Sequence, residues 1–355
     1  MTAVHVIVPD GIDDPARPSG GNTYDRRIIR GLAAIGWSVH VHAVAGSWPW
    51  PDAAAHAALA RTVAAIPDGG VVLLDGLIAS TLPEVLVPEA GRLREVVLVH
   101  MPLGDGRPGR EVAKARTRER AVLSAAAAVV TTSSWTRTRL LGRYALSPAQ
   151  VHVAEPGVDP ADLAPGTASG GELLCVAAVA PHKGHDVLLE ALATIADLRW
   201  YCTCVGALDR DPGFVDRLGR QARQDRIGDR VHFTGSRSGA DLRVAYAAAD
   251  VLVLASHAET YGMVVTEALA CGLPVIATNV GGLPQALGRG ADGHLPGLLV
   301  TPGDSAALAA ALRCWLGDTA LRRRLRTAAR ERRATLPDWS ATSVQISRLL
   351  GEVAA

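Results

Sequence analysis

Short apolar runs alternate with stretches of helical period along almost the whole chain. The apolar runs are rich in Val, Ile and Leu, which is typical of strands that are buried on both faces. The stretches between them, such as residues 23–36, place apolar residues at helical spacing and end on a glycine. This alternation predicts βα units around parallel sheets. The expected strands are 4–9, 38–44, 71–75, 95–100, 128–133, 151–156, 173–179, 200–206, 231–235, 251–256, 274–278 and 297–300.

The alternation is interrupted at residues 157–172. This segment is rich in Pro, Gly, Asp and Ser and has no apolar periodicity, so it predicts an interdomain linker. A length of 355 residues also suits two domains of ordinary size. We therefore expect an α/β protein with two Rossmann-like, doubly wound parallel-sheet domains that face a cleft. Ligands of such domains bind beyond the carboxyl ends of the strands.

Charge and composition narrow the class of protein. The 36 Lys and Arg residues nearly balance the 35 Asp and Glu residues, which argues against a general nucleic-acid-binding surface. Every apolar run is broken before the roughly 18 residues that a membrane span needs, and the first residues lack the pattern of a signal peptide. We therefore expect a cytoplasmic protein. Its five cysteines form no CxxC pair and predict free, buried thiols rather than metal ligands.

The densest chemical signal lies in residues 257–282, HAETYGMVVTEALACGLPVIATNVGG. A buried strand precedes this stretch, and MVVTEALA predicts a short helix that begins after Gly262. Unpaired N–H groups at a helix start favour a phosphate, and a glycine there lets a ligand approach the backbone. Glu259 and Glu267 flank this helix start, and carboxylates accept hydrogen bonds from the paired hydroxyls of a ribose or hexose. A solvated Glu267 is the alternative, which its apolar surroundings disfavour.

These residues resemble the signature of a known family. Glu259-x7-Glu267 followed by ALACGLPVIATNVGGLPQAL is similar to the motif of retaining, GT-B-fold glycosyltransferases of family 4 (glycosyltransferase group 1). Further similar motifs follow in the family's order and cover nearly the whole chain. They are GG (20–21), VLVH (97–100), TTSSWTRTRL (131–140), VAEPGVD (153–159), PHKGHDVLLEAL (181–192), VHFTGSRSGADLRVAYAAADVLVLAS (231–256) and LPGLLVTPGD (295–304). The resemblance implies an acceptor-binding domain (1–160), a nucleotide-sugar-binding domain (173–335) and a helix (336–355) that returns to the first domain.

The resemblance also implies roles for residues of the C-terminal domain. Glu259 would hold hydroxyls of the donor sugar, and Glu267 would hold the ribose hydroxyls of its nucleotide. Lys183, which with Lys114 makes up all the lysines of the chain, would pair with the diphosphate and stabilise the leaving group. A solvated lysine is the alternative, which its position after a strand's carboxyl end disfavours. Backbone amides would hold the sugar ring and the distal phosphate, and these belong to Tyr261, Gly262, Met263 and Val264.

Residues of the N-terminal half match further family positions. His100 ends a predicted strand and matches a histidine that reaches the donor hexose near the reacting centre, with a purely structural histidine as the alternative. Gly20 and Gly21 open the first helix and would let its amides approach the diphosphate, while also serving as a turn.

One departure from the family pattern concerns the phosphate clamp. The family commonly has a Gly-Arg pair shortly before the motif lysine, and this chain has Ala177 and Ala178 there. Either His182 or Arg237 substitutes for the missing arginine, or Lys183 and the amides suffice, or phosphate binding is weakened. The loop FTGSRS resembles the base-contacting loop, although Arg237 is equally well explained as a surface residue. The loop residues implied near the base are Gly235, Ser236 and Arg237.

The resemblance predicts a hexosyltransferase that uses a nucleotide-diphosphate sugar, with a UDP-sugar as the expected donor. We expect transfer with retention of configuration and without a metal or cofactor, because a lysine and a helix dipole can neutralise the departing diphosphate. The alternative is a catalytically weak homologue that binds a nucleotide sugar as a sensor or partner subunit. A phosphorylase or epimerase on the same fold is a third option.

The acceptor is a small molecule, a glycan or a lipid, and the sequence does not choose among them. The basic run at residues 107–120 could receive an anionic acceptor or dock on an anionic membrane, but interspersed Glu111 and Glu119 favour a solvated helix face. The abundance of Ala and Arg suggests a GC-rich bacterial source.

Overall fold

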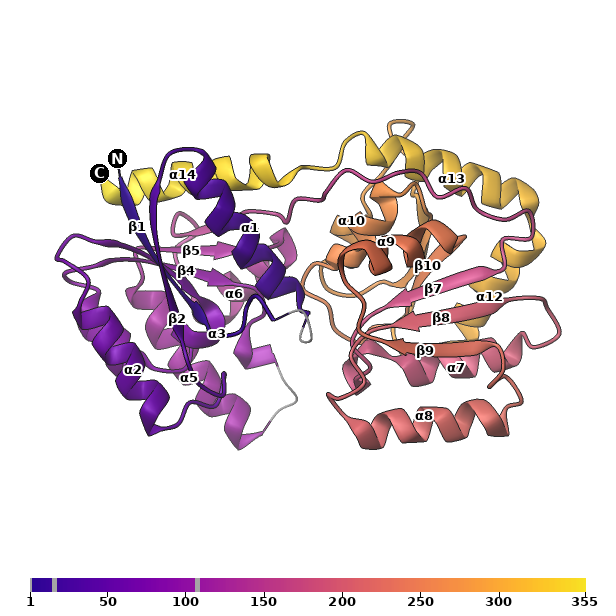
Figure 1. The fold of residues 1–355 in the computed structure, drawn as a ribbon, viewed down its shortest axis with the longest axis horizontal. Helices are drawn as coiled ribbons and strands as arrows, with labels where there is room; N and C mark the ends of the chain where they lie inside the picture. Colours follow the sequence, from indigo (N-terminus) through magenta and orange to yellow (C-terminus); the bar gives the residue numbers. More distant parts are fainter. Residues whose placement is uncertain (1, 15–17, 106–108) are drawn as a thin grey trace. The chain divides into compact units, whose positions relative to one another are not determined.

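The structure is a computed structural model that describes residues 2–14, 18–105 and 109–355. Its contacts divide the chain into two compact units (Figure 1). The N-terminal unit comprises the residues up to Asp14, Ser19–Gly157 and Pro337–Ala355, and the C-terminal unit consists mainly of Val158–Leu336. Each unit contains a six-stranded sheet whose paired strands run parallel. The predicted α/β class with two Rossmann-like parallel sheets is confirmed.

The N-terminal sheet has helices on both faces. Its strands are β1 (Ala3–Pro9), β2 (Ser38–Val44), β3 (Val71–Asp75), β4 (Arg94–Val99), β5 (Ala128–Thr131) and β6 (Val151–Val153), in the order β2-β1-β3-β4-β5-β6. Its helices are α1 (Gly20–Ala34), α2 (Ala53–Ala64), α3 (Gly76–Ala79), α4 (Pro83–Leu86), α5 (Arg110–Ala125), α6 (Ser134–Tyr144) and α14 (Trp339–Ala354). Val6 of β1 packs in one core with α1 and α14, whereas Ile7 packs in a second core with α2, α5 and α6. Because neighbouring strand residues point to opposite faces, the sheet separates two apolar layers.

The C-terminal helix completes the core of the N-terminal unit. Ile346, Leu349 and Leu350 of α14 are buried with residues of β1 and α1. The indole nitrogen of Trp37 donates a hydrogen bond of 2.8 Å to the Ser347 hydroxyl. A Cβ at Gly31 of α1 would lie 1.9 Å from the hydroxyl oxygen of Ser343, so the two helices pack closely because residue 31 is glycine.

The C-terminal unit repeats the architecture with a different strand order. Its strands are β7 (Glu172–Val176), β8 (Tyr201–Val205), β9 (Val231–Gly235), β10 (Val251–Leu254), β11 (Val275–Thr278) and β12 (Gly297–Val300), in the order β12-β11-β10-β7-β8-β9. Its helices are α7 (His185–Thr194), α8 (Pro212–Gln224), α9 (Gly239–Ala248), α10 (Met263–Ala270), α11 (Leu283–Leu287), α12 (Ser305–Gly317) and α13 (Thr319–Arg333). The fully buried indoles of Trp200 and Trp315 belong to its apolar core.

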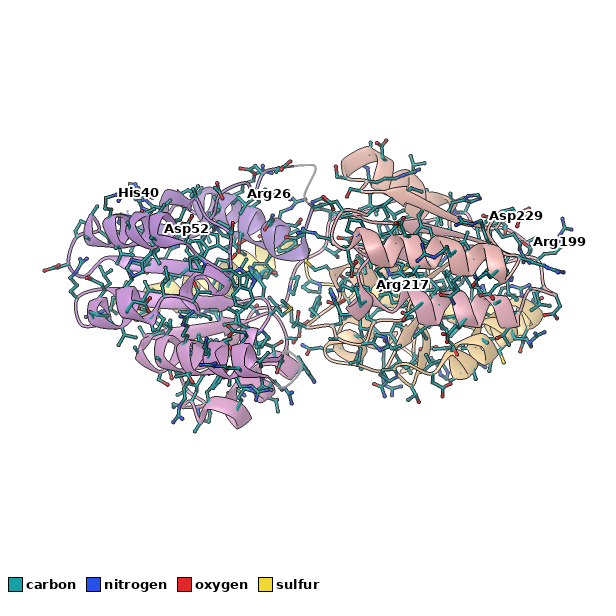
Figure 2. All side chains as sticks on the ribbon, turned by 90° about the horizontal axis from the view of Figure 1, so that it is seen from below. Arg26, His40, Asp52, Arg199, Arg217 and Asp229 are labelled. Atoms are coloured by element: carbon teal, nitrogen blue, oxygen red, sulfur yellow. The ribbon has the colours of Figure 1, made fainter. Side chains whose placement is uncertain are left out.

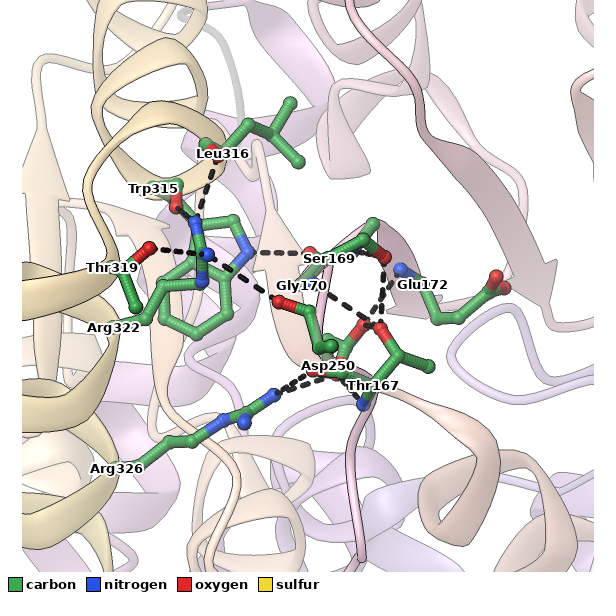
Figure 3. Close-up of polar contacts among 12 residues, drawn as sticks. Thr167, Ser169, Gly170, Glu172, Asp250, Trp315, Leu316, Thr319, Arg322 and Arg326 are labelled. Carbon is green, nitrogen blue, oxygen red and sulfur yellow. Dashed lines mark hydrogen bonds and ion pairs between the residues drawn. The ribbon is translucent and has the colours of Figure 1, made fainter.

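A buried polar network fixes the chain ahead of β7 to α13 (Figure 3). The Asp250 carboxylate is fully buried and accepts hydrogen bonds from Arg326 (2.6 Å), the Thr167 hydroxyl (2.6 Å) and the Glu172 N–H (3.0 Å). The Trp315 indole donates a hydrogen bond of 2.7 Å to the Gly170 carbonyl. A buried carboxylate is tolerated only with partners of this kind.

All twelve predicted strands are present. Their amino ends lie within one residue of the prediction, and the larger differences lie at their carboxyl ends. The run 128–133 ends as a strand at Thr131, because the Ser133 hydroxyl caps α6 by accepting a hydrogen bond from the Thr136 N–H at 3.0 Å. The first helix begins at Gly20, as its glycine pair predicted and three residues before the periodic stretch 23–36, because the Ser19 hydroxyl caps it in the same way. The predicted helix 263–270 matches α10.

The direction of winding reverses between two neighbouring strands in each sheet. In the N-terminal unit these strands are β1 and β3, and in the C-terminal unit they are β7 and β10. The carboxyl ends of such a strand pair are where open α/β sheets bind ligands. The loops that leave these strands are therefore the first places to look for a site.

Exposed charged side chains cover the outer helices and loops, as Arg217 on α8 and Asp52 before α2 illustrate (Figure 2). The described part of the basic run lies in α5, where Lys114 pairs with Glu111 at 3.0 Å and Arg116 donates to the Gly104 carbonyl. Arg107 lies outside the described residues. Every helix in the described ranges falls short of the length and apolar character needed to cross a membrane. Four of the five unpaired cysteines are buried, and Cys314 is exposed.

Candidate active site

Two predicted residues meet where the winding of the C-terminal sheet reverses. Lys183 ends a short 3-10 helix (Pro181–Lys183) that follows β7, and Glu259 lies in the loop that follows β10. The Lys183 ammonium lies 2.5 Å from Oε2 of Glu259. Both side chains are about four-fifths buried, with exposed fractions of 20% and 16%. The sequence placed each residue after a strand, but their direct pairing follows from the order of the strands.

Glycines hold the Glu259 loop in place. A Cβ at Gly281 would lie 1.6 Å from the Glu259 carbonyl oxygen, and a Cβ at Gly282 would lie 2.2 Å from that of Thr260. The Gly282 N–H donates a hydrogen bond of 3.0 Å to the Glu259 carbonyl. Gly281 also has a φ of +59°, which favours glycine. The sequence motifs gave these two glycines no role, although they are the last two residues of the stretch 257–282.

The start of α10 lies directly after this loop. Gly262 has a φ of +93°, and a Cβ there would lie 2.5 Å from a Leu283 methyl group, so only glycine fits. The first N–H groups of a helix have no intrahelical acceptor, which leaves those of Met263 and Val264 directed out of the helix. Tyr261 is almost fully buried. The loop that carries Glu259 therefore leads directly into the polar N–H groups of α10, and Lys183 from the loop after β7 pairs with that same glutamate.

Glu267 has a protein partner that the sequence did not reveal. Tyr246 of α9 is buried, and its hydroxyl donates a hydrogen bond of 2.7 Å to Oε2 of Glu267. Burial raises the pKa of Glu267, the Tyr246 hydrogen bond opposes that rise, and the charge of Asp159 adds to it. In the described chain the carboxylate's hydrogen bonds involve Oε2, so Oε1 remains available. Tyr246 thus orients the residue predicted to hold a ribose.

The remaining predicted residues of this unit are more exposed. Gly235 ends β9 with a φ of +77°, and Ser236 and Arg237 follow it on the surface. Burial and the neighbouring Lys183 charge lower the pKa of His182. A histidine whose pKa is lowered is mostly neutral at pH 7, so His182 carries little positive charge before a ligand binds. Arg237 remains a candidate substitute.

The predicted residues of the N-terminal unit also gather near the two strands between which the winding of its sheet reverses, β1 and β3. His100 follows β4, and its Nε2 lies 2.8 Å from Oδ1 of Asp25 on α1. Asp75 ends β3 and belongs to the same cluster, in which one ligand-type atom from each of the three residues lies within 4.8 Å of the others. Asp25 and Asp75 are buried. The sequence analysis named His100 but neither aspartate, because nothing in its motifs marks them.

The charges of this cluster depend on one another. Burial lowers the pKa of His100, but the charge and hydrogen bond of Asp25 and the charge of Asp75 outweigh it and raise that pKa to about 9. Burial and the Asp25 charge raise the pKa of Asp75 to about 7, against the effects of His100 and the Leu77 N–H. Because Nε2 of His100 donates to a carboxylate, it is not a free ligand atom, and we assign no metal to this cluster.

The glycine pair at the start of α1 contacts the same histidine. A Cβ at Gly21 would lie 3.2 Å from Cδ2 of the His100 ring, which is tighter than an ordinary side-chain contact. The Tyr24 ring meets the imidazole edge to face, with 5.2 Å between ring centroids. Gly20 is exposed in the first turn of α1. The absence of a side chain at residue 21 therefore lets the helix start close over His100.

Two successive parallel six-stranded sheets of this kind, with polar residues at both switch points, define the GT-B fold of glycosyltransferases. Residues 169–332 match the family model described as "Glycosyl transferases group 1". This part of the chain is therefore a glycosyl transferases group 1 domain.

Comparisons with whole chains agree with this assignment. A D-inositol 3-phosphate glycosyltransferase of Salinispora arenicola is 32% identical over 299 residues, which are 76% of this chain and 64% of the relative. A second enzyme of that name, from Mycolicibacterium vanbaalenii, is 33% identical over 204 residues, which are 50% of this chain and 45% of the relative. The chain thus spans less than two thirds of the length of these curated relatives.

Solved structures share the fold over the whole chain. A sucrose-phosphate synthase from Thermosynechococcus elongatus is 24% identical, with a TM-score of 0.79 and 99% of both chains covered. Anabaena HepE in complex with UDP-glucose is 20% identical, with a TM-score of 0.76, and the match covers 99% of this chain and 100% of HepE.

Proposed function

We propose that this protein is a hexosyltransferase that moves a hexosyl group from a nucleotide-diphosphate sugar to an acceptor hydroxyl. The observation that carries this proposal is the Lys183–Glu259 pair, with 2.5 Å between ammonium and carboxylate, beside the start of α10. A diphosphate binds an ammonium and free helix N–H groups, and sugar hydroxyls donate to a carboxylate. The group 1 domain supports the same assignment.

The proposed donor is a UDP-sugar, and the reaction needs no cofactor. Lys183 binds the diphosphate, and the amides from Tyr261 to Val264 hold the distal phosphate and the hexose. Oε1 of Glu267 accepts from the ribose hydroxyls while Tyr246 holds Oε2. Gly235, Ser236 and Arg237 face the base. The UDP-glucose complex of HepE, which shares the fold, supports the choice of nucleotide.

The proposed transfer retains the anomeric configuration and uses no metal. The acceptor oxygen bonds to the anomeric carbon as the bond from that carbon to the donor phosphate oxygen breaks. The acceptor's proton passes to an oxygen of the departing phosphate, so no side chain acts as a nucleophile. Lys183 and the dipole of α10 stabilise the negative charge that develops on the diphosphate. Glu259 orients the hexose through its hydroxyls.

The first acceptor to test is an inositol phosphate, since the relatives are called D-inositol 3-phosphate glycosyltransferases. Other phosphorylated polyols, glycans and lipids follow it. The proposed compartment is the cytoplasm, where unpaired cysteines remain reduced.

Calorimetric titration with UDP, GDP, ADP and their sugar conjugates tests the donor, with and without a chelator. We expect chelator-insensitive binding of UDP and a UDP-sugar that Lys183→Ala weakens. NMR of the early product then tests retention, and an inverted anomeric centre would refute it. Selective binding without transfer to any acceptor supports the alternative, a sensor or partner subunit. If no nucleotide binds, both functions are wrong.

A further inference from the structure

Asp25, Asp75 and His100 form a buried triad. A histidine that only binds a sugar does not need two buried carboxyl groups beside it. Two carboxyl groups and one imidazole, contributed by α1, β3 and the end of β4, are brought within 4.8 Å. The Asp25 side chain is 2% exposed and that of His100 is 18% exposed. Within the described residues, the buried Oδ2 of Asp25 has no hydrogen-bond partner. Folding two acids and a histidine into an apolar layer is costly unless they share protons.

Asp25 fixes which nitrogen of His100 faces inward. Nε2 lies 2.8 Å from Oδ1 of Asp25 and must carry the hydrogen of that bond, since a carboxylate only accepts. Gly21 and Tyr24 pack against the ring: a Cβ at Gly21 would lie 3.2 Å from Cδ2, and the Tyr24 ring meets the imidazole edge to face. Nε2 is occupied by Asp25, and Nδ1 does not belong to the polar atoms of the described chain that are buried without a partner. Nδ1 is therefore the nitrogen left for a ligand.

The protonation state of the ring decides what Nδ1 offers. In the neutral ring with hydrogen on Nε2, Nδ1 is an acceptor, whereas in the imidazolium it is a donor. Asp25 and Asp75 raise the pKa of His100 to about 9, so the donor form prevails at neutral pH. The titratable groups that face His100 are Asp25 and Tyr24 of α1 and Asp75 of β3, and the Tyr24 hydroxyl is already committed to the Ala154 carbonyl at 2.9 Å.

Asp75 lies beside Asp25, with carboxylate oxygens of the two residues within 4.8 Å of each other. One oxygen of Asp75 accepts a hydrogen bond of 2.7 Å from the Leu77 N–H at the start of α3, which fixes its position. Its pKa of about 7 lets it hold a proton that it can share with Asp25 near neutral pH.

We propose that Asp25 and Asp75 are positioning residues that hold His100 as an imidazolium with Nε2 directed inward, so that Nδ1–H remains a hydrogen-bond donor to the donor hexose at neutral pH. This inference rests on the proposed function for the identity of the ligand. It goes beyond that function, because the two carboxyl groups keep Nδ1–H available as a hydrogen-bond donor at pH values where Nδ1 of a free histidine would be an acceptor.

The charge state is tested first in the protein without substrate. An NMR titration of the His100 ring is expected to give a pKa well above that of an ordinary histidine in the wild type. In Asp25→Asn the carboxamide still accepts the hydrogen bond but carries no charge, so the pKa should fall below the ordinary value. Asp52→Asn, which exchanges the same groups at an exposed helix cap, is the control and should leave the titration unchanged.

Activity supplies the second readout. In Asp25→Asn, kcat/KM should fall about tenfold for each pH unit above the new His100 pKa, whereas the wild type and Asp52→Asn should stay level up to about pH 9. A merely structural role would lower activity equally at all pH values. If Asp25→Asn does not fold, Asp75→Asn should give a smaller shift of both curves in the same direction.

Two results would overturn the inference. One is an unchanged His100 titration and pH profile in both variants, and the other is a wild-type titration that a chelator alters, which would mean that the cluster holds a metal. The proposed function fails separately, when the wild type transfers no sugar from any nucleotide donor. The titration in the free protein decides between charged and neutral His100 in either case.

Discussion

The ammonium group of Lys183 and the carboxylate of Glu259 neutralise each other across 2.5 Å, at the carboxyl ends of the two strands where the C-terminal sheet reverses its winding. The two residues are 76 positions apart in the chain. If the site binds the nucleotide sugar proposed above, this pairing keeps both charges compensated until the phosphate and hydroxyl groups of that ligand replace it.

Lys183→Ala should weaken binding of a nucleoside diphosphate by about tenfold to a hundredfold, because it removes a hydrogen-bonded charge. Lys114→Ala is the matched control, since it removes the other lysine, on exposed α5. Calorimetry measures both. Equal affinities for the two variants would show that Lys183 does not bind the diphosphate.

Glu259→Gln and Glu267→Gln should separate transfer from nucleotide binding. Glu259→Gln is expected to lower kcat about a hundredfold while the nucleotide still binds, because the hexose loses its acceptor. Glu267→Gln should instead weaken the nucleotide, and Tyr246→Phe should do so to a smaller extent because it frees the Glu267 side chain. Calorimetry and initial rates for the three variants test these roles, and indistinguishable effects of the two glutamate variants would contradict them.

Gly281→Ala should disturb the Glu259 loop in two ways. Alanine is strained at a positive φ, and its side chain also collides with the loop. Its Cβ would collide with the Glu259 carbonyl oxygen, whereas a Cβ at Gly293, with a φ of +81°, meets no atom within 4 Å. Both variants should lose about 1–2 kcal/mol in free energy of unfolding from the backbone conformation alone. Only Gly281→Ala should also lower transfer. Loss of transfer in Gly293→Ala as well would place the cause outside the contact with Glu259.

Arg326→Ala should destabilise the C-terminal unit, because it leaves the fully buried Asp250 carboxylate without its cation. Removing one partner of a buried pair costs about 3–5 kcal/mol, and the partial exposure of Arg326 places the expected loss at the lower end. Arg324→Ala removes an exposed arginine from the same helix and is the control. Denaturant unfolding measures both, and similar midpoints would refute the role of the ion pair.

Glu95 should make the N-terminal unit less stable as the pH rises. Its side chain is buried in β4, and within the described residues neither carboxylate oxygen has a hydrogen-bond partner. Burial and the charge of Glu89 raise its pKa to about 7, although Arg92 opposes the rise. The folded state therefore favours the protonated acid, so stability is greatest below the ordinary pKa of 4.5 and is lost as the pH rises through about 7.

Glu95→Gln should remove this dependence and stabilise the protein at pH 8 by roughly 3 kcal/mol at most, with little effect at pH 4.5. Glu84→Gln, at an exposed position, should show no such difference. Denaturant unfolding at several pH values gives the comparison. A wild-type curve with the same slope as that of Glu95→Gln would contradict a buried, uncompensated carboxylate.

The sequence predicted the strands well because each is a compact apolar run. For the same reason it placed Lys183 and Glu259 after the carboxyl ends of strands and Glu267 in the helix that follows Gly262. It could not predict that Tyr246 meets Glu267 or that Asp25 and Asp75 meet His100. Those contacts depend on strand order and on helix orientation, and the residues have no motif of their own. The lowered pKa of His182 likewise depends on burial, which no motif shows.

The packing of α14 has a consequence for synthesis on the ribosome. The chain of the C-terminal unit is continuous from Val158 to Leu336, whereas the apolar layer around β1 remains open until Ile346 and Leu350 emerge. The N-terminal unit is thus translated first but completes its folding last. The apolar surface formed by Val4, Val6 and Tyr24 must be protected from aggregation for nearly the whole of translation.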